Sequence, residues 1–337
     1  MANDLTVSQS DRQNVLNNPY AVSKLQEHLA LGGITYKGKV VFTKQQLVAL
    51  FDVSESTIEK YLASHGDELK ANGYEVLRGK SLKEFHELAS GTVTNYGTKT
   101  TVLGVFDFRS TLNIAMLLTE SEPAKAIRSR ILDIVLAVMA ERAGGAPKFI
   151  NQRDRDYLPA AYQEYSYRKV FTDALSCYLE MGSYKFGVYT NKIYKIVFNE
   201  NAAEYKRILN LASKDELRDT LYAEVLTAIA SLENGIAEEM KKLSGKLERK
   251  LTPAELNDIF DAAGSNPFLK PIIEDARTKM ASRDKGFRDA LHHKLETYIR
   301  AVPEGDFERF LGAASSALED QLKDPETLAV FKRLKDR

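Results

Sequence analysis

The stretch FDVSESTIEKYLASHG, residues 51–66, constrains the fold most, because it matches the second of two short helices joined by a tight turn. Apolar residues recur at helical spacing on both sides of that turn and would face inward. They are Leu47, Leu50, Phe51, Val53, Ile58, Tyr61 and Leu62. Ser54 stands where it can cap the second helix. This pattern predicts a helix-turn-helix.

The neighbouring residues extend this prediction to a small mixed domain. Thr43 and Gln46 form a capping box that opens the first helix. The second helix is expected over residues 54–71. Residues 33–42 alternate in character and predict a short strand pair, and the β-formers at 73–79 predict one strand of a wing.

The outward positions of the second helix point to DNA, with one difficulty. These exposed candidates are Ser54, Glu55, Ser56, Glu59 and Lys60. Phosphates repel glutamate, although a carboxylate can accept from the amino group of cytosine. Affinity for double-stranded DNA must then come from flanking cations, namely Lys37, Lys39, Lys44, Arg78, Lys80 and Lys83. An ordinary helix pair in a small core remains the alternative.

Composition limits the other possibilities. Lys+Arg and Asp+Glu number 47 each, so the chain lacks the basic excess usual in nucleic-acid-binding domains. A local patch or a dimer must supply it. The single cysteine allows no intrachain disulfide, and neither a signal core nor a long apolar run is present, which favours a cytoplasmic protein that does not span a membrane. The sequence contains no phosphate-binding glycine motif of a nucleotide hydrolase.

The length of the chain and its glycine and proline residues predict several domains. At ~150 residues per domain, 337 residues suggest two or three, and the Gly144–Gly145 pair followed by Pro147 marks the clearest boundary. We expect a mainly α protein: a winged helix-turn-helix-like domain with a few short strands over 1–89, and helical domains after it. These are a helical module over 90–145 that begins with a loop at 90–105, a tyrosine-rich domain over 146–250, and a C-terminal helical bundle over 251–337.

Residues 106–135, FDFRSTLNIAMLLTESEPAKAIRSRILDIV, are the most specific stretch. They resemble a signature of phage antirepressor-type proteins and of the RhuM-like family. The matching residues are Arg109, Leu117, Leu118, Ser121, Glu122, Ala124, Lys125, Ile127, Arg128 and Leu132. The similarity covers about 43–142, where Val48 and Asp52 depart from the usual alanine and glycine of repressor turns, and extends faintly through 189–209.

This resemblance implies a protein of prophage or mobile-element origin that binds DNA or an intracellular regulator. Arg109, Lys125, Arg128 and Arg130 would lie on neighbouring helices and add a basic face to the DNA-binding residues. The alternative is that these cations are solvated and balance Glu120, Glu122 and Asp133.

The sequence offers fewer candidate residues for catalysis than for DNA binding. Arg218, Asp219 and Tyr222 fall within one helical turn and are candidates for holding a phosphate and relaying a proton, although an ion pair beside a packed tyrosine is the alternative. His292 and His293 diverge by about 100° around a helix, which argues against a shared metal. Cys177 is expected in the core. We predict no cofactor and no metal.

The leading functional hypothesis is a sequence-specific DNA-binding regulator of the RhuM-like or antirepressor-like kind. It would be a homo-oligomer, because paired half-sites double the contacts, and its C-terminal half would bind a protein partner. The alternative is a toxin or effector of a toxin–antitoxin or antiphage defence system. In that case the tyrosines of the third segment could stack single-stranded bases beside Lys185, Lys192, Lys195, Lys206 and Arg207, unless they serve in packing.

Overall fold

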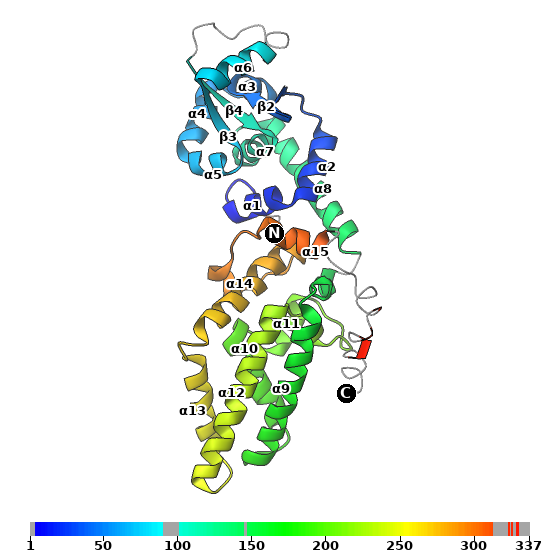
Figure 1. The fold of residues 1–337 in the computed structure, drawn as a ribbon, viewed down its shortest axis with the longest axis vertical. Helices are drawn as coiled ribbons and strands as arrows, with labels where there is room; N and C mark the ends of the chain where they lie inside the picture. Colours follow the sequence, from blue (N-terminus) through cyan, green and yellow to red (C-terminus); the bar gives the residue numbers. More distant parts are fainter. Residues whose placement is uncertain are drawn as a thin grey trace. The chain divides into compact units, whose positions relative to one another are not determined.

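The computed structural model describes residues 4–89, 101–144 and 147–312, together with 323, 325, 328 and 329. The chain divides into two compact units, Met1–Glu141 and Arg142–Arg337. The first unit combines helices with one antiparallel sheet, and the described part of the second is built from helices (Figure 1). The expected mainly α class with a few short strands is confirmed. Among the described residues, no helix has the length and apolar character needed to cross a bilayer.

The helices of the first unit include the predicted pair, α3 and α4, and the helices around it. They are α1 (Gln9–Asn17), α2 (Pro19–Leu29), α3 (Lys44–Phe51), α4 (Glu55–Ser64), α5 (Gly66–Ala71), α6 (Gly79–Ala89), α7 (Phe108–Leu117) and α8 (Glu122–Arg142). The Thr43–Gln46 capping box opens α3 as expected. The single helix expected over 54–71 is wrong, because the chain breaks at His65 and continues as the short helix α5.

Four strands form the sheet, in the order β1-β2-β4-β3 and antiparallel throughout. They are β1 (Ile34–Tyr36), β2 (Lys39–Thr43), β3 (Tyr74–Arg78) and β4 (Val102–Asp107). The expected strands at 33–42 and 73–79 are confirmed. The loop expected at 90–105 is wrong at its end, because β4 is a central strand of the sheet. The rest of that loop, at 90–100, lies outside the described residues.

Each face of the sheet has its own core. Phe42 and Phe106 pack with the helix pair, α7 and α8 in a large cluster that includes Phe51, Ile58 and Leu112. A smaller cluster on the other face packs α6 against β1, β2, β3 and β4. Residues of the first two predicted segments therefore share one core, and the structure divides the chain between Glu141 and Arg142, close to the expected glycine boundary.

In the second unit, two long helices, α9 (Tyr157–Tyr178) and α12 (Ala223–Leu247), run along each other (Figure 1). The remaining α-helices pack around them. They are α10 (Lys185–Phe198), α11 (Ala202–Ile208), α13 (Pro253–Gly264), α14 (Lys270–Phe287) and α15 (Glu304–Leu311). Three 3-10 helices complete the described part: η1 (Pro147–Arg153), η2 (Leu217–Thr220) and η3 (His293–Tyr298).

Candidate nucleic-acid interface

The turn between α3 and α4 is short and well determined by local hydrogen bonds. Asp52 ends α3 with a left-handed backbone, φ 50° and ψ 54°, a conformation that aspartate tolerates better than most residues. The Val53 amide donates to the Val48 carbonyl, and Ser54 Oγ accepts from the Thr57 amide 3.1 Å away. Aspartate thus fills the position of the usual turn glycine, and the predicted Ser54 cap is confirmed.

The buried side of α4 fixes its position on the unit. Ile58 is fully buried and Tyr61 nearly so. The Tyr61 hydroxyl donates to the Glu120 carboxylate at 2.8 Å, and Ser121 Oγ donates to the Phe51 carbonyl at 2.5 Å. The loop between α7 and α8, which lies within residues 106–135, therefore holds both helices of the pair. This contact was not predictable from helical periodicity.

The opposite side of α4 forms an exposed polar surface. Ser54, Glu55, Ser56, Glu59 and Lys60, here called the α4 surface, are all exposed. The Lys44 ammonium group lies 2.6 Å from a carboxylate oxygen of Glu55 and 2.7 Å from one of Glu59. Partial burial alone would lower the pKa of Lys44, but these two hydrogen bonds raise it. Lys44 thus offsets the repulsion that the glutamates would exert on phosphate.

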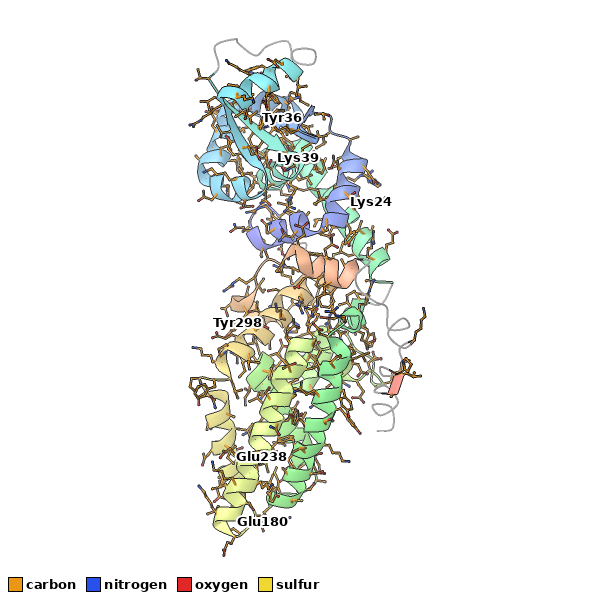
Figure 2. All side chains as sticks on the ribbon, in the orientation of Figure 1. Lys24, Tyr36, Lys39, Glu180, Glu238 and Tyr298 are labelled. Carbon is orange, nitrogen blue, oxygen red and sulfur yellow. The ribbon has the colours of Figure 1, made fainter. Side chains whose placement is uncertain are left out.

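The other flanking cations lie on or near the sheet. Lys37 and Lys80 both approach Glu84 of α6, at 3.8 and 3.9 Å, so these three residues form one cluster, the Glu84 cluster. Lys39 pairs in register with Tyr36, which packs on the α6 face (Figure 2). Lys83 is exposed on α6.

Arg78 ends the edge strand β3 and is exposed. Because side chains alternate along a strand, it shares the face of Tyr74, which packs in the core of the helix pair. Of the predicted cations on the sheet and α6, Arg78 therefore points to the side of the sheet on which α4 packs.

The three candidate arginines of residues 90–145 have different surroundings. Arg128 donates to the carbonyls of Ala115 and Leu118, so it satisfies the C-terminal end of α7. Arg109 is half-buried and donates to Asn17 at 3.4 Å. Arg130 is exposed on α8. Of the three, Arg130 has the exposure that a phosphate contact needs.

The candidate catalytic residues do not form the expected cluster. Leu217–Thr220 is a 3-10 helix and Tyr222 has an extended backbone, so the single helical turn assumed for Arg218, Asp219 and Tyr222 is absent. Buried Arg218 contacts the carboxylates of Glu164 and Glu233.

Tyr222 and Asp219 have other surroundings. Buried Tyr222 donates to Asp284 at 2.8 Å, and Asp219 is exposed. The three residues thus contribute to different parts of the second unit.

A second buried charge cluster was missed by sequence reasoning. His292 is 3% exposed, and its ring nitrogens lie 2.8 Å from Glu200 and 2.7 Å from Asp284. Arg288 lies 3.1 Å from Asp284 on its other oxygen. Glu200 is 92 residues from His292, so no local spacing indicates the contact. The described residues contain no group of three or more His, Cys, Asp or Glu side chains that could hold a metal ion.

This cluster makes the stability of the second unit depend on pH. Burial alone would lower the pKa of His292, but the hydrogen bonds to Asp284 and Glu200 raise it from 6.5 to about 9. The charged ring therefore contributes stability that is fully present below pH 6.5 and is lost as the pH rises through 9. Burial raises the pKa values of Tyr205 and Tyr222, so these phenols stay neutral in that window.

We expect the free energy of unfolding to fall by up to about 3 kcal/mol between pH 6.5 and 9.5, given ~1.4 kcal/mol per pKa unit. Urea titrations across this range measure it. His292→Gln should abolish most of the pH dependence, and His293→Gln, which changes an exposed neighbour, should retain it. Equal pH dependence in both variants would contradict the assignment to His292.

Two further expectations concern single residues of the tyrosine-rich segment. Cys177 is exposed, so its predicted place in the core is wrong. Five tyrosines are buried and unable to stack on bases as they stand; these are Tyr157, Tyr189, Tyr194, Tyr205 and Tyr222. Of the lysines thought to accompany them, Lys185 is also buried. These five tyrosines therefore serve in packing, which was the alternative interpretation.

Comparison with known proteins assigns no relative: no protein-family model, no curated protein and no solved structure matches the chain.

Proposed function

We propose that the protein is a sequence-specific DNA-binding regulator of the RhuM-like or antirepressor-like kind. The observation that supports it best is the exposed first turn of α4, held at the end of a tight helix pair by Tyr61 and Ser121. In a helix-turn-helix, this is the part of the second helix that reaches base edges in the major groove.

The α4 surface offers the chemistry for base recognition. The hydroxyls of Ser54 and Ser56 donate or accept, and the free amides of the first helical turn favour a phosphate oxygen. Glu55 or Glu59 can accept from the cytosine amino group. Lys44 lies within 2.7 Å of a carboxylate oxygen of each glutamate, so this surface supplies specificity more than affinity.

Affinity would come from cations beyond α4. Arg78 and Lys80 are exposed at the end of β3 and the start of α6, and Arg130 is exposed on α8. A zero net charge leaves little general attraction to DNA, so two copies on paired half-sites are part of the proposal. The proposal also includes a cytoplasmic location, an origin in a prophage or mobile element, and a protein partner that binds the second unit.

Replacing Arg78 and Lys80 together by alanine should weaken binding to a selected duplex and flatten its salt dependence. Each lost phosphate contact lowers the slope of log K against log salt by about 0.9, so the expected change is roughly 1.8 per bound copy. Anisotropy titrations at several salt concentrations, on a duplex enriched from a random library, measure it.

The matched control removes Lys24 and Lys70, two exposed lysines on α2 and α5 of the same unit. Its slope should stay within about 0.5 of the parent value, since neither lysine belongs to the proposed contact surface. A double Arg78/Lys80 variant that binds as tightly and as salt-dependently as the parent would contradict this contact. Growth arrest on induced expression, undiminished by changes in the α4 surface, would instead favour the toxin or effector hypothesis.

A further inference from the structure

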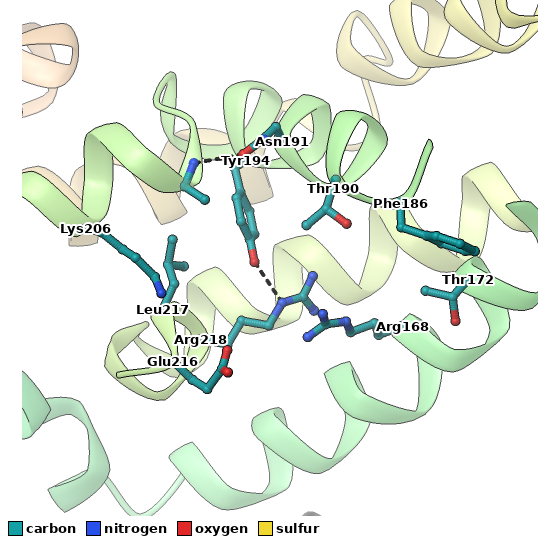
Figure 3. A pocket seen from close by; sticks show the side chains of 12 residues that line it. Arg168, Thr172, Phe186, Thr190, Asn191, Tyr194, Lys206, Glu216, Leu217 and Arg218 are labelled. Atoms are coloured by element: carbon teal, nitrogen blue, oxygen red, sulfur yellow. Dashed lines mark hydrogen bonds between the residues drawn. The ribbon is translucent and has the colours of Figure 1, made fainter. Parts of the chain in front are cut away.

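A cavity of about 330 Å³ opens in the second unit, among α9, α10, α11, η2 and the residue before η2. Its volume lies near the lower end of small-molecule sites, which span roughly 300–1,000 Å³. Four residues line it from a single face of α10: Gly187, Thr190, Asn191 and Tyr194. Figure 3 shows the last three. Asn191 accepts from the Ala202 amide and Tyr194 accepts from Arg218, while Thr190 adds a hydroxyl to the lining.

The groups that face the cavity are mainly hydrogen-bond donors. Arg168 of α9 has no hydrogen-bond or ion-pair partner among the described residues. The Lys206 ammonium donates to the Asp215 carbonyl at 2.9 Å, which leaves two of its three donors. Asn191 uses its oxygen to accept from the Ala202 amide, which leaves its amide NH₂. Several donors without matching acceptors favour a ligand rich in acceptor oxygens.

The charges of the cavity also favour an anion. Arg218 lines the cavity, but its charge is compensated by Glu164 and Glu233, which are not lining residues. Arg168 and Lys206 have no such carboxylate partner among the described residues, and both line the cavity (Figure 3). Glu216 is the carboxylate among the lining residues, and its exposure to solvent screens its charge.

We propose that this cavity binds a small phosphorylated molecule of about nucleotide size, with its phosphate held by Arg168 and Lys206. An arginine fork and a lysine ammonium are the side chains that bind phosphate oxygens best. Thr190 and Asn191 contact the polar remainder of the ligand, and the Phe186 ring at the cavity wall covers a flat apolar part. This site is independent of the DNA-binding proposal.

Titration calorimetry on the full chain tests this site with ribonucleoside 5′-monophosphates, inorganic phosphate and unphosphorylated nucleosides. The monophosphates should bind, inorganic phosphate should compete with them, and the nucleosides should bind at least about tenfold more weakly. Arg168→Gln and Lys206→Gln should each weaken monophosphate binding by about tenfold or more.

Matched controls lie one residue away on the same helices. Lys169→Gln and Arg207→Gln change exposed cations outside the cavity and should leave the affinity within about twofold. Circular dichroism melting of all four variants checks that they are folded. The proposal is overturned if no phosphate compound binds the parent, or if Arg168→Gln and Lys206→Gln bind like the controls. Binding confined to a 5′-phosphorylated oligonucleotide would also overturn it, by assigning the cavity to nucleic acid.

Discussion

Arg218→Met is expected to destabilise the second unit by about 3–5 kcal/mol, the usual effect of removing one partner from a buried ion pair. Arg218 lies between Glu164 and Glu233, which are 3% and 0% exposed, and Tyr194 accepts from its Nε at 2.9 Å. Methionine preserves much of the side-chain volume but removes the guanidinium that both buried carboxylates contact. Urea unfolding followed by circular dichroism gives the size of the loss, and hydrogen exchange assigns it to α9 and α12.

Two controls separate charge from packing. Arg207→Met changes an exposed arginine in the same unit and should alter stability by less than about 0.5 kcal/mol. Adding Glu164→Gln and Glu233→Gln to Arg218→Met should recover part of the lost stability, because neutral amides cost less to bury than unpaired carboxylates. A loss below about 1 kcal/mol for Arg218→Met would show that this cluster does not hold the helices together.

Phe51→Ala is expected to cost about 3–5 kcal/mol and to destabilise the whole first unit. Phe51 is fully buried at the end of α3, in the cluster that also contains residues of β4, α7 and the start of α8. Its carbonyl accepts from Ser121, so the loss should reach residues 106–135. Hydrogen exchange should therefore rise in β4 and α7 as much as in α3 and α4.

The control for this prediction is Leu88→Ala, a side chain 58% exposed on α6. It should change stability by less than about 0.5 kcal/mol. Exchange that increases in α3 and α4 while β4 and α7 stay protected would mean that the helix pair is an independent domain, contrary to the shared core.

Local signals in the sequence predict the helix pair well. The Thr43–Gln46 capping box, the Ser54 cap and the apolar spacing of Leu47, Phe51 and Ile58 are contacts between residues a few positions apart. The strands β1, β2 and β3 follow from β-forming residues bounded by glycines. Such features depend on interactions between residues that are close in the sequence, so one sequence is enough to predict them.

The rest depends on long-range contacts. β4 follows a polar, threonine-rich stretch, and its place in the centre of the sheet is set by pairing with strands more than 20 residues away. His292 meets Glu200 across 92 residues, and Arg218 meets Glu164 from another helix. Helical spacing also placed Cys177 in the core, whereas that side of α9 is exposed. The cavity among α9, α10, α11 and η2 likewise joins four elements that no motif connects.

The most direct test of the account is whether the α4 surface determines which DNA sequence is bound. The measurement is selection from a random duplex library with the parent, with Glu55→Gln and Ser56→Ala, and with Lys70→Gln as a control on α5. If the α4 surface contacts base edges, the α4 variants will change the preferred base at one or two positions, while the control keeps the parent's sequence. Enrichment of no sequence by the parent, or of one identical sequence by every variant, would contradict it.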